Sequence, residues 1–133
     1  MFSKVRARLQ EGRLHGDEGF TLIELLVVII IIGILLAIAI PSYLKFKDRA
    51  NASAAQANVR AAVPGMEAYN ADNGAGGYTG VTLPILQASF DAGIKNITIL
   101  SSSTTTYCIK STVGASTYYK AGPASDITTT VCT

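Results

Sequence analysis

Histidine and cysteine are scarce in this chain, which narrows the chemistry that it can perform. It has one histidine, His15, and two cysteines, Cys108 and Cys132. General acid or base catalysis therefore has no evident host, and neither a His-Glu-x-x-His motif nor a glycine-rich phosphate-binding motif occurs. A metal site needs more ligands than two cysteines with His15 far away in the sequence. We expect no enzyme activity, no cofactor and no metal.

Charged residues are also few, at 15% of the chain, and they nearly cancel. The net charge is +2, and residues 20–133 carry seven Lys/Arg against six Asp/Glu, which leaves +1. This balance argues against a nucleic-acid-binding domain driven by bulk charge. Tyr118-Tyr119-Lys120 offers stacking and a cation to DNA, but a sheet strand is the commoner explanation, so contact with DNA is only weakly supported.

One unbroken apolar run, residues 25–40, dominates the N-terminal part of the chain. A helix over residues 20–40 would rise about 31 Å, close to the roughly 30 Å thickness of the bilayer hydrocarbon. Glu24 does not suit a plain anchor, because an ionised carboxylate costs about 2.5 to 3.5 kcal/mol at the helix centre and less near its edge. We expect one membrane span, and no second one is visible in the sequence. The position of Glu24 needs another explanation.

The flanks of this run supply that explanation. The sequence Gly19-Phe20-Thr21-Leu22-Ile23-Glu24-Leu25-Leu26, with Pro41 beyond the run, closely resembles the N-terminal signature of type IV prepilins. In that family a membrane-bound peptidase cuts after the glycine and methylates the new amine, and the apolar helix becomes the packing core of a filament. The resemblance covers residues 19–42. It implies cleavage between Gly19 and Phe20, N-methylation of Phe20, and assembly roles for Glu24 and Thr21.

The resemblance also implies a function and a set of partners. The chain would be the structural subunit of a type IV pilus, a homopolymeric surface filament for adhesion, motility or DNA uptake. Its partners would be a prepilin peptidase, an inner-membrane assembly platform and, before assembly, the membrane. The precursor would sit in the inner membrane with its N-terminus in the cytoplasm, and the assembled filament would be extracellular.

Three alternatives remain. A pseudopilin of type II secretion or competence would share the leader and the helix, although the C-terminal cysteine pair and the lack of an acidic calcium loop around Asp126 favour the pilin. A single-pass anchor carrying a binding domain explains the span but neither Gly19-Phe20 nor Glu24. A secretory signal cut after Ala37-Ile38-Ala39 fits poorly, because the apolar run is longer than usual and the helical pattern continues past the cut.

Four segments follow from these patterns: a leader over residues 1–19, a membrane and filament-core helix over 20–41, an amphipathic continuation over 42–72, and a globular region over 73–133. Gly33, Pro41 and Pro64 are the positions expected to weaken or bend the helix, and Pro64-Gly65 predicts a kink or a break before the helix resumes to about Ala71. Small and apolar residues at spacings of three and four predict the packed face: Ala52, Ala55, Val59, Ala62, Met66 and Tyr69.

Beyond the helix the sequence predicts a loop over residues 70–80, a short helix over 83–90 begun by Pro84, and then strands. The strands are expected over residues 96–100, 105–110, 116–120 and 128–131 as an antiparallel meander. The fold class is therefore α+β, and the resemblance makes it a pilin fold, with the long helix packed on a small sheet.

Cys108 and Cys132 lie on the side of the membrane opposite the basic leader if the positive-inside rule holds, which places them in an oxidising compartment. Only one intrachain pairing is possible, so we expect a disulfide. Closing this loop of about 25 residues would contribute about 3 to 4 kcal/mol in the chain-entropy model. Pilins have a similar cysteine-bounded C-terminal region.

Overall fold

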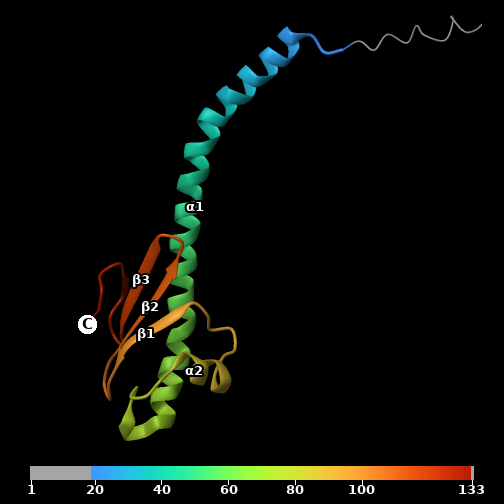
Figure 1. The fold of residues 1–133 in the computed structure, drawn as a ribbon. Helices are drawn as coiled ribbons and strands as arrows, with labels where there is room; N and C mark the ends of the chain where they lie inside the picture. Colours follow the sequence, from blue (N-terminus) through green and yellow to red (C-terminus); the bar gives the residue numbers. More distant parts are fainter. Residues whose placement is uncertain (1–18, 133) are drawn as a thin grey trace, which may run out of the picture. The chain divides into compact units, whose positions relative to one another are not determined.

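The computed structural model describes residues 19–132. They form two compact units, the first ending at Ile40 and the second beginning at Pro41. The elements in chain order are α1 (Leu22–Asn73), a 3₁₀ turn (Gly74–Gly76), α2 (Leu83–Ser89), β1 (Ile97–Ser102), β2 (Tyr107–Val113), β3 (Ser116–Gly122) and β4 (Ile127–Thr128) (Figure 1). This is the α+β class predicted from the sequence, with a long N-terminal helix and a small antiparallel sheet.

The first unit is helical from Leu22 and leaves its apolar side chains exposed. By length and composition α1 is suited to cross a membrane, with a mean hydropathy of 3.3 over its most apolar window and none of that window buried. A Cβ added at Gly33 would meet no atom within 4 Å. No packing partner within the described chain therefore requires glycine at this position.

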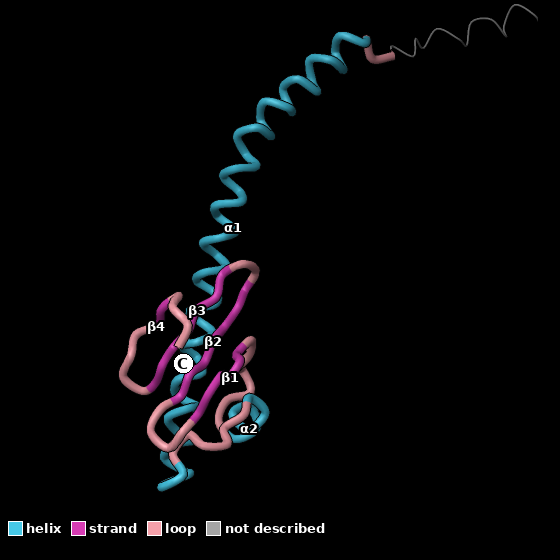
Figure 2. The backbone as a smooth tube through the Cα atoms, turned by 60° about the vertical axis from the view of Figure 1, so that its left-hand side comes forward, coloured by secondary structure: helices cyan, strands magenta, loops and turns pink. Residues whose placement is uncertain are grey.

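In the second unit α1 supplies one side of the core and the sheet supplies the other (Figure 2). Ala55, Val59, Ala62 and Met66 are fully buried, so the predicted packing face is confirmed at these four positions, while Ala52 and Tyr69 are half-buried. The side chains that complete the core come from the loop after α1, from α2 and the segment after it, and from the sheet: Tyr78, Val81, Leu86, Ile94, Ile97, Tyr107 and Ile109.

Of the two outcomes predicted at Pro64-Gly65, the break does not occur, because α1 continues through both residues to Asn73, and the kink stays a prediction. Gly65 is buried, and a Cβ there would lie 2.9 Å from Ile94 Cδ1 and 3.6 Å from Leu86 Cδ2. Glycine thus allows the segment around α2 to lie close against the helix. Packing at this contact outweighs the weak helix propensity of the Pro-Gly pair.

The predicted loop over residues 70–80 is wrong in its first part, which is helical to Asn73 and then forms the 3₁₀ turn. Asn73 Nδ2 donates to the carbonyl oxygens of Gly77 at 2.9 Å and Thr79 at 3.3 Å, so the side chain holds the turn that follows the helix. The Tyr78 amide then donates to Ser103 O at 3.0 Å, which ties this loop to the β1–β2 connection.

The four strands form one antiparallel sheet in the order β1-β2-β3-β4. The first three lie within three residues of the predicted bounds, and the short helix α2 ends one residue earlier than predicted. The last strand is wrong in most of its extent, since only Ile127 and Thr128 pair with β3. Beyond Thr128 the chain has left the β3 ladder, and its end is bonded through Cys132 to Cys108 on β2.

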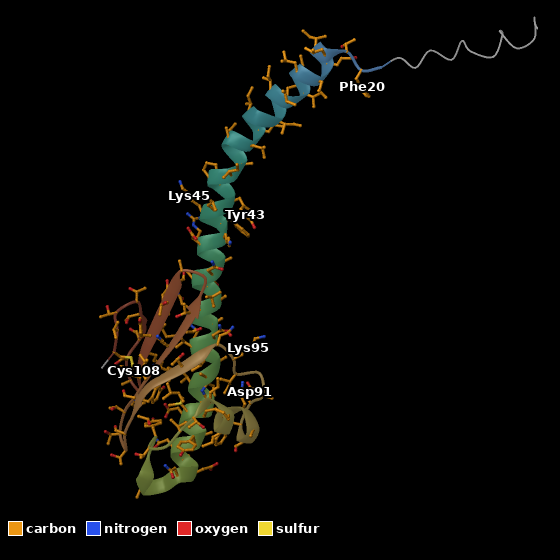
Figure 3. All side chains as sticks on the ribbon, in the orientation of Figure 1. Phe20, Tyr43, Lys45, Asp91, Lys95 and Cys108 are labelled. Atoms are coloured by element: carbon orange, nitrogen blue, oxygen red, sulfur yellow. A yellow bond between two sulfur atoms is a disulfide. The ribbon has the colours of Figure 1, made fainter. Side chains whose placement is uncertain are left out.

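The disulfide between Cys108 and Cys132 is present, with a Cα–Cα distance of 5.8 Å. Cys108 is 1% exposed, and its position on the sheet is labelled in Figure 3. The bond spans a sequence separation of 24 residues that contains all of β3 and β4. It therefore holds the C-terminal segment against a central strand.

Candidate functional site

The first turn of α1 is closed by a reciprocal pair of hydrogen bonds between Thr21 and Glu24. The Thr21 backbone N–H and its hydroxyl both donate to Glu24 Oε2 at 2.9 Å, and the Glu24 backbone N–H donates to Thr21 Oγ1 at 3.2 Å. Thr21 is therefore the N-cap, and Glu24 is the third helical residue of a capping box. The two predicted assembly residues are thus brought together by local geometry.

Glu24 uses only one of its two carboxylate oxygens in this arrangement. Within residues 19–132, Oε2 accepts both bonds from Thr21 and Oε1 accepts none. The carboxylate sits where the helix dipole is positive, which favours a negative charge. It is also the one charged side chain in residues 20–40, surrounded by exposed apolar ones.

The spacing of Thr21 and Glu24 predicts this cap, although the sequence analysis did not include it. Thr21-x-x-Glu24 before an apolar run has the spacing of a capping box, in which the two side chains satisfy helix-end N–H groups. The assembly roles of Thr21 and Glu24 were inferred from the resemblance alone. The local hydrogen bonds give both residues a role in starting the helix, and their assembly roles stay predictions.

Gly19 and Phe20 precede the helix in irregular backbone, and both are exposed. Phe20, labelled in Figure 3, has 89% of its surface exposed. No atom of residues 21–132 lies within 4 Å of the position that a Cβ would take at Gly19. The peptide bond between them is therefore open to a second molecule. The remainder of the predicted leader, residues 1–18, lies outside the described part of the chain.

The other predicted site residues are spread along α1. Gly33 and Pro41 lie inside the helix without ending it, and Pro64 lies inside it further on, beside the buried Gly65. None of these three contributes a hydrogen bond to the Thr21–Glu24 pair. Their role in helix flexibility stays a prediction.

A buried polar cluster in the second unit was not predicted. Tyr78 Oη donates to Glu67 Oε2 at 2.8 Å, Tyr107 Oη donates to Glu67 Oε1 at 3.4 Å, and the two rings meet edge to face with centroids 4.8 Å apart. Burial, followed by the hydrogen bond to Glu67 and its charge, raises the pKa of Tyr78 to about 12. Burial and the same carboxylate also raise the pKa of Tyr107.

This cluster joins the loop after α1 and strand β2 to the helix through the Glu67 carboxylate. The two hydroxyls stay protonated and donate to the two oxygens of the Glu67 carboxylate, so these buried polar groups satisfy one another. Over residues 19–132 there is also no group of three His, Cys, Asp or Glu side chains placed to hold a metal ion. No local sequence pattern could have joined these residues, because Glu67 and Tyr107 are 40 positions apart.

Comparison with known proteins identifies a family motif near the N-terminus and several similar proteins. Residues 14–40 match the family described as the prokaryotic N-terminal methylation motif. The type IV wide pilus major component PilA4 of Thermus thermophilus is 36% identical over 113 residues, which cover 83% of this chain and 85% of that protein.

Other relatives match a shorter region. The type IV major pilin protein PilA of Myxococcus xanthus is 47% identical over 53 residues, 40% of this chain and 24% of that protein. The type II secretion system core protein G of Pseudomonas aeruginosa is 37% identical over 57 residues, 43% of this chain and 40% of that protein. Because the similarity to PilA4 extends over most of both chains and the methylation motif covers the first helical residues, this chain belongs to the type IV pilin family.

Proposed function

We propose that the chain is the structural subunit of a type IV pilus, cut between Gly19 and Phe20, N-methylated on Phe20 and polymerised through its N-terminal helix. The observation that carries the proposal is a helix whose large apolar side chains are exposed from Leu22 to Ile40, with a single carboxylate near its start. Such a surface needs cover from lipid or from other helices. A filament of identical subunits provides the second kind of cover after the membrane has provided the first.

The capping box explains how the helix can begin at the membrane surface. The hydrogen bonds of this box join Thr21 to Glu24, so the first turn keeps them once a leader is removed. The basic residues of the leader, Lys4, Arg6 and Arg13 among them, favour a cytoplasmic N-terminus by the positive-inside rule. A prepilin peptidase and an inner-membrane assembly platform would then be the partners.

The free oxygen of Glu24 suggests how subunits would set their axial position. A free α-amine has a reference pKa of about 8 and is mostly protonated at neutral pH. The new Phe20 amine of a neighbouring subunit can bind Glu24 Oε1 while Oε2 keeps its bonds to Thr21. Pairing offsets the desolvation of both charges in an apolar layer and specifies the stagger between helices. A bond to the amine of the same chain is the rival, since four residues also separate the two groups within one helix.

Gly33 and Pro41 are proposed as the positions at which the helix can stretch during assembly. Pro41 lacks a backbone N–H, and Gly33 has the most backbone freedom of any residue in the apolar run. A Cβ at Gly33 would meet no atom of residues 19–132 within 4 Å, which fits a packing need for glycine that arises between subunits.

The alternative is a pseudopilin of type II secretion or competence, which the similarity to the secretion protein G supports. That similarity covers less than half of the chain, whereas the similarity to the pilus component PilA4 covers most of it. The Cys108–Cys132 bond adds a further feature expected of pilins. The pilin is therefore the better-supported proposal.

The deciding experiment combines electron microscopy of sheared surface material with the intact mass of the subunit. Long filaments made of a chain that begins at a methylated Phe20 are the expected result. Short periplasmic assemblies without surface filaments would favour the pseudopilin. A soluble product that begins at Ile40 would overturn both proposals.

A further inference from the structure

A groove of about 550 Å³ opens in the second unit between α1 and the connection from β3 to β4. Gln56 and Arg60 on α1 form one wall. Lys120 on β3, with Ser125 and Asp126 in the connection, forms the other. The volume lies within the range of about 300 to 1,000 Å³ that is usual for small-molecule sites.

Lys120 brings a positive charge to this groove that is only partly compensated. The residue is 9% exposed, and its Nζ donates to the carbonyl oxygens of Pro123, at 3.3 Å, and of Ser125. Within residues 19–132 it forms no ion pair with a carboxylate. Two carbonyl dipoles offset part of the cost of taking the ammonium out of water, and they leave its net charge in place.

Arg60 adds a second cation with all its donors available. It is exposed, and it has no hydrogen bond or ion pair to any residue between 19 and 132. A guanidinium presents a planar fork of donors that matches a carboxylate in a bidentate arrangement. With Lys120 it gives the groove two cations against one carboxylate, that of Asp126, so an anionic ligand is favoured.

The remaining lining narrows the class of anion. The Asp126 carboxylate, which has no partner in the described chain, accepts hydrogen bonds from hydroxyl groups and would repel a compact phosphate. The Ser125 hydroxyl and the Gln56 carboxamide both donate and accept. Val63, Pro64 and Ile127 add apolar surface to the same groove. A carboxylate side chain from another protein would fill only a small part of this volume.

We propose that this groove binds a sugar acid, a monosaccharide that carries one carboxylate. The ligand carboxylate pairs with Arg60 and lies in the field of Lys120. The sugar hydroxyls bind Asp126 and Ser125, and the C–H face of the ring packs on the apolar lining. Neither the proposed cleavage nor polymerisation is needed for this binding.

The test titrates the full-length ¹⁵N-labelled chain in detergent micelles with galacturonate, galactose and acetate, and follows backbone amide shifts. Galacturonate is expected to give saturable shifts at Gln56, Arg60 and Ser125 with a Kd on the order of 1 mM. Galactose lacks the carboxylate and acetate lacks the hydroxyls, so each should bind about tenfold more weakly or worse. Arg60→Gln should weaken galacturonate binding by a similar factor.

Arg49→Gln is the matched control, since it removes the same group from an exposed position on the same helix outside the groove. It should leave the affinity for galacturonate unchanged. Absent shifts, an equal response to acetate or galactose, or equal losses in the two variants would each overturn the proposal. An Arg60→Gln chain that keeps its affinity for galacturonate but no longer forms filaments would also overturn the proposal. That result would assign Arg60 to a contact between subunits.

Discussion

Thr21 and Glu24 satisfy each other at the start of α1: the Thr21 N–H and hydroxyl donate to Glu24 Oε2, and the Glu24 N–H donates to Thr21 Oγ1. The Glu24 carboxylate thereby caps the helix, while its other oxygen accepts no hydrogen bond from residues 19–132. If Glu24 both caps α1 and binds a neighbouring subunit, formation of the first helical turn is coupled to docking of that subunit. Substitutions at Glu24 can separate these two roles.

Glu24→Ala should be cut normally and assemble poorly, because the docking charge is lost. Removing one partner of a buried pair costs about 3 to 5 kcal/mol, so filament yield should fall by tenfold or more. Glu24→Gln is the informative companion, since its amide oxygen can still accept from Thr21 but carries no charge. Filament yield is measured on sheared material, and cleavage by subunit mass. Normal filaments from Glu24→Gln would mean that capping alone matters.

Gly19→Val should leave the precursor uncut. The position lies in exposed irregular backbone with open space around it, so the change should not disturb the chain itself. A β-branched side chain beside the scissile bond would block the close approach of a peptidase. Intact mass of the membrane-bound chain is the measurement, with Leu22→Val as a control of similar size inside the helix. A Gly19→Val subunit of normal mature mass would remove the cleavage assignment.

Cys108→Ser should lower the free energy of unfolding by about 3 to 4 kcal/mol, because the unfolded chain regains the freedom that the crosslink removes. Cys132→Ser should have a closely similar effect, since either change opens the same loop. Urea unfolding in micelles, followed by tyrosine fluorescence, gives the value. Cleavage should proceed in both variants while filament yield falls. Unchanged stability under oxidising conditions would contradict the prediction.

Gly77→Ala should destabilise the second unit by more than about 2 kcal/mol, for two reasons that add. Gly77 has a φ of 59°, and a Cβ there would overlap the backbone carbonyl of Thr104. Gly74 has a φ of 56° but open space around it, so Gly74→Ala carries the conformational cost alone, about 1 kcal/mol. Equal unfolding midpoints for the two variants would show that the overlap relaxes without cost.

Stability should fall as the pH rises from 10 towards 12. The raised pKa of Tyr78, about 12 against an ordinary 10.0, means that the unfolded chain loses this proton before the folded chain does. Unfolding in this window therefore releases a proton, and the contribution of Tyr78 is full below pH 10 and is lost as the pH passes 12. The raised pKa of Tyr107 acts in the same direction.

The variant Tyr78→Phe should flatten this dependence, and Tyr78→Phe with Tyr107→Phe should flatten it further. Tyr43→Phe is the control, because Tyr43 is exposed on α1 and forms no part of the cluster around Glu67. The measurement is the urea midpoint of unfolding of each variant at several pH values between 9 and 12. A slope that is the same in all three variants would exclude the cluster as its source.

The sequence by itself determined the features that depend on neighbouring residues. The apolar run after Glu24 specifies an exposed lipid-compatible helix, since each residue in it is apolar whatever the fold. The small and apolar residues at helical spacing from Ala55 to Met66 specify which face of the C-terminal half of α1 is buried, because helical periodicity is local. Cys108 and Cys132 had only each other to pair with. The Thr21-x-x-Glu24 cap was equally readable from spacing.

The tertiary structure decided what depends on residues far apart. Pro64-Gly65 weakens a helix locally, yet α1 continues because Gly65 packs against Ile94 and Leu86, a contact that no local pattern encodes. Glu67 receives the Tyr107 hydroxyl, and Arg60 and Lys120 share a groove, only because the sheet folds onto α1. Such contacts depend on the register and packing of whole elements, whereas propensity and periodicity extend over a few turns of one element.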